Sequence, residues 1–461
     1  MARAHWLIAV AVGTAAVFGL PPTPARAATV TIGENQEVLV DGEPFLPIMQ
    51  WLQSSSRIAH QSTLGINTFV GNGGQNSSQE YLDECAAHGV WGVMNPGDLS
   101  VASHGSLLGW IFGDEPDLES HQTEPSEVLA EYQTIKAADP NHPTFLTVTA
   151  RFYSEFDPPP WMNGSRDRYT EYAQATDIIG FDLYPIYGWC QPDWLYMTGA
   201  SHEELVTLYA PNQPTYQWIE CARTSSQWCE LDERGEDDGP YPEEVRNEVW
   251  QAIAHGATAI GYFTHSWECP GYTQFCLTAE QEAELIRTNG QLTALAAPIL
   301  SPRYAEVVTV TTSPEAQVDW IAKAYQDQVY LFAVNVDRAS TEATFTVPGM
   351  AADAEVTVVD ESRTVQASGE SFTDGFDELG VHIYAIAVTG SSGTGGGGTG
   401  GGSSSSSGSG GAGGSSSGAT PTSGEDDGGC GCRLAGSPAP SLALLGAFVG
   451  LALAATRRRH R

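Results

Sequence analysis

Basic residues are scarce in this sequence of 461 residues, which has 20 Lys and Arg against 56 Asp and Glu. The formal net charge is -36. A surface this acidic repels a phosphate backbone, so the composition argues against a nucleic-acid partner. Solubility of an exported protein explains the charge equally well, and the charge does not indicate a substrate.

The sequence also lacks the signatures of a metal or dinucleotide site. No cysteine pair before residue 300 has C-x-x-C spacing, and no Gly-rich fingerprint follows the first expected strand. We therefore predict no metal and no cofactor. Cys221 with Cys229 and Cys269 with Cys276 are each spaced to close a short loop, although six cysteines leave the pairing open. Cys85 is expected to be a buried thiol.

Residues 1–27 are predicted to be a secretory signal peptide. Arg3 and His5 precede an apolar run from Trp6 to Leu20, and Ala25-Arg26-Ala27 has the small-x-small pattern of a cleavage site. The run is short for a membrane anchor. The mature protein is therefore expected to be exported, where disulfides are stable.

The last residues of the chain predict attachment to the cell surface. A Gly/Ser-rich linker over 390–428 precedes a segment over 429–461 with Cys430-Gly431-Cys432, an apolar run and terminal arginines. This tail resembles the MYXO-CTERM sorting signals of myxobacterial surface proteins. The resemblance implies that a sortase-like membrane protease recognises the tail. A simple membrane anchor is the alternative, and both place the protein outside the cytoplasm.

Eight short apolar segments predict buried parallel strands, with helices or helix-length gaps between them. They are Phe45–Leu52, Gly65–Asn72, Gly89–Asn95, Leu107–Phe112, Pro143–Thr149, Asp177–Leu183, Thr215–Ile219 and Ala257–Thr264. This number closes a (β/α)8 TIM barrel, which we place at 28–300. The gap between the third and fourth segments has no convincing helix. The rival fold is a doubly wound open sheet.

From Tyr304 onward the pattern changes to strand-like segments without helices. Such spacing predicts a small all-β sandwich, placed at 301–389. Trp320 is its only tryptophan. We therefore expect this domain to be structural rather than carbohydrate-binding.

Side chains at the carboxyl ends of barrel strands line the active-site mouth. Here the strand ends carry mostly carboxylates, amides and aromatic rings, including Gln50, Asp114, Glu115, Asp182, Tyr184, Glu220 and Trp267. Sugars require flat apolar faces for ring stacking and acceptors for hydroxyl groups. His265 is the only histidine among these ends, which argues against a metal-dependent hydrolase. A carbohydrate substrate is the expected partner.

The motif Gly113-Asp114-Glu115-Pro116 after the fourth strand, with Glu220 after the seventh, resembles clan A of the glycoside hydrolases. The resemblance implies that Glu115 is the general acid/base and Glu220 the nucleophile. It also implies substrate-binding roles for Tyr184 and Trp267. Many clan members have Asn immediately before the acid/base, where this chain has Asp114, so the identity of the sugar is left open.

These features predict a retaining glycoside hydrolase that uses two glutamates. Asp114, Asp182 and Gln50 are expected to bind substrate, and Asp182 and Glu268 are reserve nucleophiles. Trp161, Trp189 and Trp194 lie on long loops and give a weak signal for further subsites. The alternative is a non-catalytic carbohydrate-binding surface protein built on a glycosidase-like barrel.

Overall fold

The computed structural model describes residues 27–388, apart from 74–75, 121, 227–230, 232–233 and 236. The predicted linker and sorting tail lie outside the described residues, as does the predicted signal peptide except for Ala27. Within the described part of the chain, no helix is long and apolar enough to cross a membrane.

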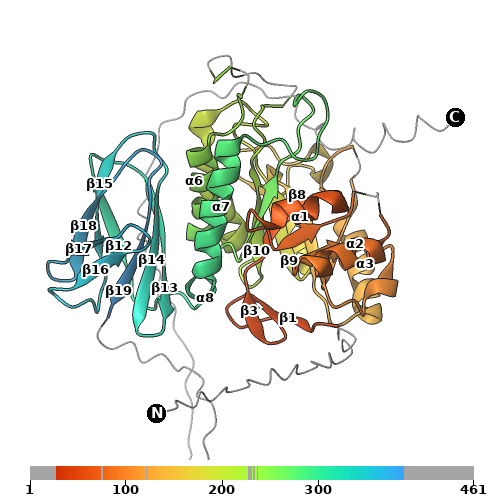
Figure 1. Cartoon of the computed structure of the whole chain (residues 1–461), viewed down its shortest axis with the longest axis horizontal. Helices are drawn as coiled ribbons and strands as arrows, with labels where there is room; N and C mark the ends of the chain where they lie inside the picture. Colours follow the sequence, from red (N-terminus) through yellow and green to blue (C-terminus); the bar gives the residue numbers. More distant parts are fainter. Residues whose placement is uncertain are drawn as a thin grey trace, which may run out of the picture. The chain divides into compact units, whose positions relative to one another are not determined.

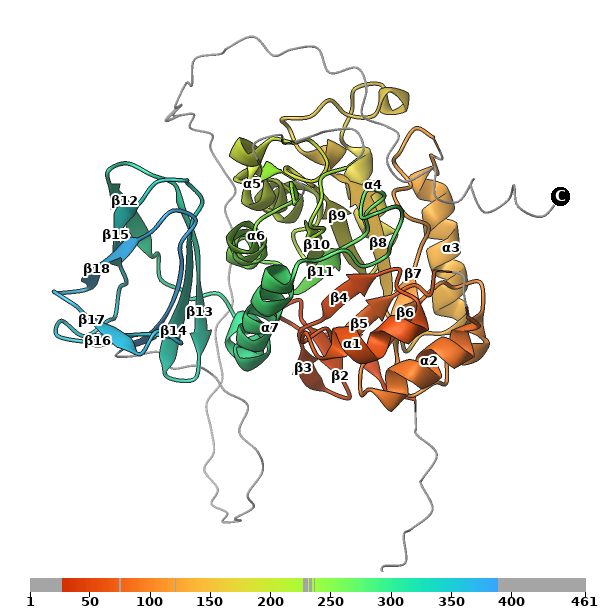
Figure 2. The same ribbon diagram turned by 45° about the horizontal axis from the view of Figure 1, so that its top comes forward.

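Eight parallel strands form a closed barrel, which confirms the predicted TIM barrel (Figure 2). Their order around the barrel is β10-β11-β4-β5-β6-β7-β8-β9. The strands are β4 (Ile48–Trp51), β5 (Thr68–Val70), β6 (Trp91–Met94), β7 (Leu107–Ile111), β8 (Thr144–Thr149), β9 (Ile178–Asp182), β10 (Thr215–Glu220) and β11 (Ala259–Phe263). All residues of β8, β10 and β11 are buried, as expected for strands covered on both faces.

The barrel interior is filled by large aromatic side chains opposite glycines. Tyr216 and Trp218 pack in one cluster with inward-facing residues of the other strands. A Cβ atom at Gly180 would lie 2.3 Å from the Tyr216 ring, and one at Gly261 would lie 2.2 Å from the Trp218 ring. The two glycines therefore provide the space that these rings occupy, and the interior is a packed core rather than a pore.

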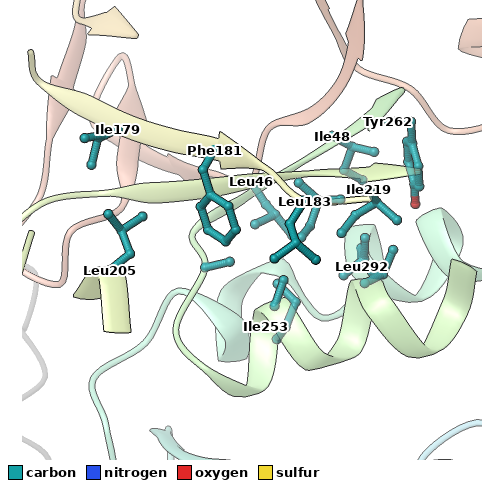
Figure 3. Close-up of a cluster of buried hydrophobic side chains, with 14 of the residues drawn as sticks. Leu46, Ile48, Ile179, Phe181, Leu183, Leu205, Ile219, Ile253, Tyr262 and Leu292 are labelled. Atoms are coloured by element: carbon teal, nitrogen blue, oxygen red, sulfur yellow. The ribbon is translucent and has the colours of Figure 1, made fainter. Parts of the chain in front are cut away.

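Helices cover the outside of the barrel. The predicted helices are present as α2 (Ser78–Ala87), α3 (Pro125–Ala138), α6 (Pro242–Ala254) and α7 (Ala279–Ala294), together with the shorter α1 (Ile58–Ser62), α4 (Arg168–Gln174), α5 (Met197–Glu204) and α8 (Ala296–Ile299). Between β6 and β7 the described chain forms only a 3-10 turn, Leu99–Val101, in agreement with the weak helix signal there. Figure 3 shows Phe181, Leu183 and Ile219 directed from the strands toward Ile253 and Leu292 of the helices.

Three short strands precede the barrel: β1 (Val30–Ile32), β2 (Val38–Val40) and β3 (Glu43–Phe45). They form an antiparallel sheet, as the alternating pattern in this segment predicts. Val30 and Val38 belong to the same buried cluster as the inward-facing barrel residues. The sheet therefore packs against the barrel interior.

The C-terminal part of the described chain consists of two antiparallel sheets, which confirms the predicted all-β domain (Figure 1). The strand orders are β12-β15-β18 and β13-β14-β19-β16-β17. The strands are β12 (Thr309–Ser313), β13 (Val318–Tyr325), β14 (Gln328–Asn335), β15 (Thr341–Thr346), β16 (Glu355–Val358), β17 (Arg363–Gln366), β18 (Ser371–Phe376) and β19 (Val381–Ala387). The sequence pattern did not predict β17 and β18, because both are rich in polar residues.

Helix α6 connects the barrel to this sandwich. The Trp250 ring stacks on Phe332 of β14 with centroids 5.8 Å apart. The Asn247 side-chain amide donates to the backbone oxygens of Asn335 and Leu379, at 2.9 and 3.0 Å. Because the sandwich buries one face of α6 while the barrel buries another, this helix is fixed from both sides.

His255 forms an ionic clamp across the same interface. Its ring nitrogens lie 3.0 Å from Glu203 of α5 and 3.0 Å from Asp319 of β13. Burial alone would lower the pKa of His255, but hydrogen bonds and ion pairs with Asp319 and Glu203 outweigh it and raise the pKa to about 9. The protonated imidazole therefore stabilises the folded state.

This clamp predicts a pH-dependent stability. A raised folded-state pKa gives stabilisation that is complete below the unfolded value of about 6.5 and is lost as the pH rises through about 9. His255→Gln should therefore lower the free energy of unfolding by about 2 kcal/mol at pH values near 6, and by much less near pH 10. Thermal unfolding at both pH values measures this, with His60→Gln at an exposed site as the control. An equal loss at the two pH values would contradict the clamp.

Candidate active site

The chain turns sharply after β7 and delivers two acidic side chains to the carboxyl end of the barrel. Glu115 has a φ of 47°, in the left-handed region that non-glycine residues rarely adopt. Its backbone N–H donates to the Thr147 oxygen at 3.1 Å, which fixes this turn to β8. Asp114 is half-buried, whereas Glu115 is buried. A strained backbone held at a strand end is a common feature of functional sites.

Asp117 fixes this turn through hydrogen bonds to neighbouring elements. It is fully buried and accepts hydrogen bonds from the Thr149 N–H at 2.9 Å, from the Thr149 hydroxyl and from the Tyr169 hydroxyl at 2.8 Å. These bonds connect the end of β7 to the end of β8 and to α4. Sequence reasoning did not identify Asp117; its place two residues after Glu115 was the only available signal.

Glu115 is paired with Asp182, the last residue of β9. A hydrogen bond joins the two carboxyl groups. Two carboxyl groups can share a hydrogen bond only if one of them carries a proton. Burial, followed by the charges of Asp182 and Asp114, raises the pKa of Glu115 well above its usual value. Burial also raises the pKa of Asp182, to about 7, although the hydrogen bond from Glu115 opposes this shift. The pairing thus raises the pKa of Glu115 and acts to lower that of Asp182.

Glu220 ends β10 and is completely buried. Its carboxylate accepts hydrogen bonds from the backbone N–H groups of Ile186 at 2.8 Å and Tyr187 at 2.5 Å. Burial raises the pKa of Glu220 to about 8, while these two bonds and one from Glu248 act in the opposite direction. The segment after β9 thus orients Glu220 through its main chain.

Tyr184 interacts electrostatically with both Glu115 and Glu220. Burial raises the pKa of its phenol, and the charges of Asp182, Asp114, Glu115 and Glu220 raise it further. The phenol is therefore within electrostatic reach of the carboxyl groups that follow β7, β9 and β10. Its half-buried ring stacks on Phe263 of β11, with centroids 5.0 Å apart. The predicted site residues Asp114, Glu115, Asp182, Tyr184 and Glu220 thus share one electrostatic environment.

Two aromatic rings stand on the loop after β11. Trp267 is half-buried, and Tyr272 is 55% exposed with its ring centroid 5.4 Å from that of Trp267. A disulfide between Cys269 and Cys276 closes this loop. Sequence reasoning identified Trp267 but not Tyr272, because a tyrosine in a loop gives no periodic signal. Exposed rings held by a constrained loop are suited to stacking on a sugar face.

Gln50 occupies a different position from the other predicted residues. It is fully buried, and its amide donates to the Thr264 hydroxyl at 2.8 Å and the Tyr262 oxygen at 3.3 Å. These contacts lie within the barrel wall, between β4 and β11. They give no support for a substrate-binding role. Glu268, a reserve nucleophile, is exposed on the loop after β11.

The cysteines follow the predictions in part. The Cys269–Cys276 disulfide and the buried free thiol of Cys85 agree with expectation. Cys221 is also a buried free thiol, so the suggested Cys221–Cys229 bridge is wrong. Cys190 is disulfide-bonded instead. Cys221 lies directly after the fully buried strand β10 and belongs to the main hydrophobic core, which explains why it is not on a surface loop.

Comparison with known proteins relates the barrel to glycoside hydrolases. A glycoside hydrolase family model described as beta-galactosidase matches residues 122–291, which run from the loop before α3 to α7. The matched residues contain β8, β9, β10 and β11, so this part of the barrel is similar to glycoside hydrolase domains. No curated protein matches the chain.

Solved structures give a weaker likeness. An alpha-amylase from Geobacillus thermoleovorans, complexed with acarbose, is 9% identical over 74% of this chain and 98% of its own, with a TM-score of 0.48. A GH30 endoxylanase from Clostridium papyrosolvens is 12% identical over 78% of this chain and 100% of its own, with a TM-score of 0.43. At these TM-scores the likenesses carry no information about substrate.

The Asp117 network predicts a large loss of stability in Asp117→Ala. Removal of the carboxylate leaves the Thr149 and Tyr169 donors buried without an acceptor, which should lower the free energy of unfolding by about 3 kcal/mol. Denaturant unfolding measures the loss. Asp157→Ala, at an exposed position in the next loop, is the matched control and should change stability by about 0.5 kcal/mol or less. Equal effects of the two substitutions would contradict the role of Asp117.

Proposed function

We propose that the protein is a retaining glycoside hydrolase in which Glu115 is the general acid/base and Glu220 the nucleophile. The observation that carries the proposal is the burial of Glu115 and Glu220 after β7 and at the end of β10, where burial and the charges of Asp182 and Asp114 raise the pKa of Glu115. A glycosidase needs one carboxyl group that remains protonated near neutral pH and a second one that is anionic.

In the first step, a Glu220 oxygen forms a bond to the anomeric carbon while the bond from this carbon to the leaving oxygen breaks. The leaving oxygen takes the proton of Glu115. In the second step, Glu115 removes a proton from water, whose oxygen attacks the anomeric carbon and releases Glu220. Two inversions at the anomeric carbon give net retention.

Asp182 is better suited to support Glu115 than to replace Glu220. The two carboxyl groups of a retaining pair lie about 5–5.5 Å apart, so that the anomeric centre fits between them. Asp182 is hydrogen-bonded to Glu115, which leaves no room for a sugar between the two groups. Glu220 is fully enclosed, so attack requires the segment around Ile186 and Tyr187 to give access to its carboxylate.

The description of the matching family makes an aryl β-galactoside the first substrate to test, followed by a panel of other aryl glycosides. On the best substrate, Glu115→Gln and Glu220→Gln should each lower kcat/KM by at least about 100-fold. Azide should rescue Glu220→Gly with formation of the inverted glycosyl azide. Glu127→Gln, at an exposed position of α3 on the outside of the barrel, is the control. Rescue of Asp182→Gly in place of Glu220→Gly would move the nucleophile to Asp182.

The Glu115–Asp182 pair predicts a change in the pH profile. Activity requires protonated Glu115, so kcat/KM falls as the pH rises through the pKa of this group. The charge of Asp182 raises that pKa, and Asp182→Asn removes the charge. The alkaline limb of the profile should therefore move to lower pH in Asp182→Asn. An unchanged alkaline limb would contradict the pairing.

We also propose that the protein is exported, and we consider a second candidate function. The signal peptide and tail of the sequence support export and attachment to the cell surface, with a membrane protease as partner of the tail. A carbohydrate-binding surface protein is the second candidate, favoured by the exposed Tyr272 beside Trp267. Binding of oligosaccharides without cleavage of any aryl glycoside would favour this candidate.

A further inference from the structure

Glu248 is a buried carboxyl group with no role in the predicted site. It lies on α6, outside the barrel wall, and none of its side chain is exposed. Its hydrogen-bonding neighbour is Glu220, through both the carboxyl group and the backbone N–H of that residue. A buried carboxylate without a paired cation is strongly unfavourable, so this arrangement requires an explanation.

The contacts of Glu220 show which of the two groups carries the proton. A hydrogen bond between two carboxyl groups requires one proton, and the backbone N–H groups of Ile186 and Tyr187 already donate to Glu220. Two such donors stabilise the charged form of a carboxyl group. The negative charge therefore belongs to Glu220 and the proton to Glu248. Burial and the charge of Glu220 raise the pKa of Glu248 in the same sense.

The cations nearby are directed to a different glutamate. Arg234 donates to both oxygens of Glu244, at 2.7 Å each, and Arg338 of the sandwich donates to Glu244 at 2.6 Å. Glu244 lies one turn before Glu248 on α6 and is also fully buried. Arg234 also interacts with Glu220 through its charge, and Glu244 interacts with both Glu220 and Glu248. The other titratable groups that interact with these two glutamates include Tyr184, Tyr187 and Cys221. The interactions that shift the pKa of Glu248 come from Glu220 and Glu244, neither of which is a cation.

We propose that Glu248 is a positioning residue, whose protonated carboxyl group donates a hydrogen bond to Glu220 and holds it anionic and oriented for attack. The inference rests on the proposed role of Glu220. It also gives the sandwich a function, because Arg338 and the Asn247 bonds to Asn335 and Leu379 fix the helix that carries Glu248. The sandwich thus sets the position of the nucleophile's partner without contacting substrate.

Two substitutions of Glu248 distinguish the effect of its hydrogen-bond donor from the effect of its packing. Glu248→Gln keeps the shape and an N–H donor, so kcat should stay within about threefold of wild type. Glu248→Leu removes the donor, and kcat should fall by at least about 10-fold with little change in KM. The hydrogen bond from Glu248 lowers the pKa of Glu220, so its loss raises that pKa. The acid limb of the kcat/KM profile should therefore move to higher pH in Glu248→Leu but not in Glu248→Gln. Glu243→Gln, at an exposed position of the same helix, is the control.

Infrared difference spectroscopy at neutral pH tests the proton without relying on activity. Glu115 and Glu248 should both contribute to the band of buried protonated carboxyl groups. The band should keep its wild-type intensity in Glu243→Gln and lose only the Glu248 contribution in Glu248→Gln. An unchanged band in Glu248→Gln, or equal kcat losses in the Gln and Leu variants, would overturn the proposal. A decrease of the band in Glu248→Gln in a protein that hydrolyses no glycoside would support the Glu248 proton while contradicting the proposed function.

Discussion

The desolvation of carboxyl groups is the constraint on which this site depends. A carboxylate buried without a partner is so unfavourable that the group takes up a proton or finds donors. The site meets this requirement by pairing: Glu115 shares a proton with Asp182, and Glu220 accepts hydrogen bonds from two backbone N–H groups and from Glu248. In the first arrangement burial and neighbouring charges raise the pKa of Glu115, and in the second the hydrogen bonds oppose the rise that burial causes in the pKa of Glu220. Two carboxyl groups of the same kind thus acquire opposite roles from their surroundings.

The rest of the fold keeps these pairs in place. The turn that carries Glu115 is fixed to β8 through Thr147 and Asp117, and the segment that donates to Glu220 follows β9. Helix α6 is packed between the barrel and the sandwich, so its buried glutamates have little freedom to move away. A closed barrel alone brings the strand ends together, but the protonation states depend on the helix and the sandwich behind it.

The sequence was sufficient for the architecture because its eight apolar segments are bounded by clear breaks, and the strand ends then located Glu115, Asp182, Tyr184 and Glu220. The substrate-binding role of Gln50 stays a prediction; the side chain lies buried between β4 and β11, which the sequence did not indicate, because one strand end does not show which residues face the barrel interior. The polar strands β17 and β18 had no apolar pattern. Glu248 was not predictable, because a glutamate in an amphipathic helix normally faces solvent. Here Glu248 lies against Glu220 at the end of β10, while the sandwich packs on the neighbouring residues Asn247 and Trp250 of the helix.

The most direct test of this account is to trap the glycosyl-enzyme. An activated fluorinated galactoside, or the corresponding derivative of whichever sugar is cleaved, forms the covalent intermediate faster than water releases it. Digestion and mass spectrometry then locate the modified residue. The account predicts one added glycosyl group on Glu220, formed more slowly in Glu248→Leu than in Glu248→Gln. Modification of Asp182, or inactivation with no glycosyl group on Glu220, would contradict it.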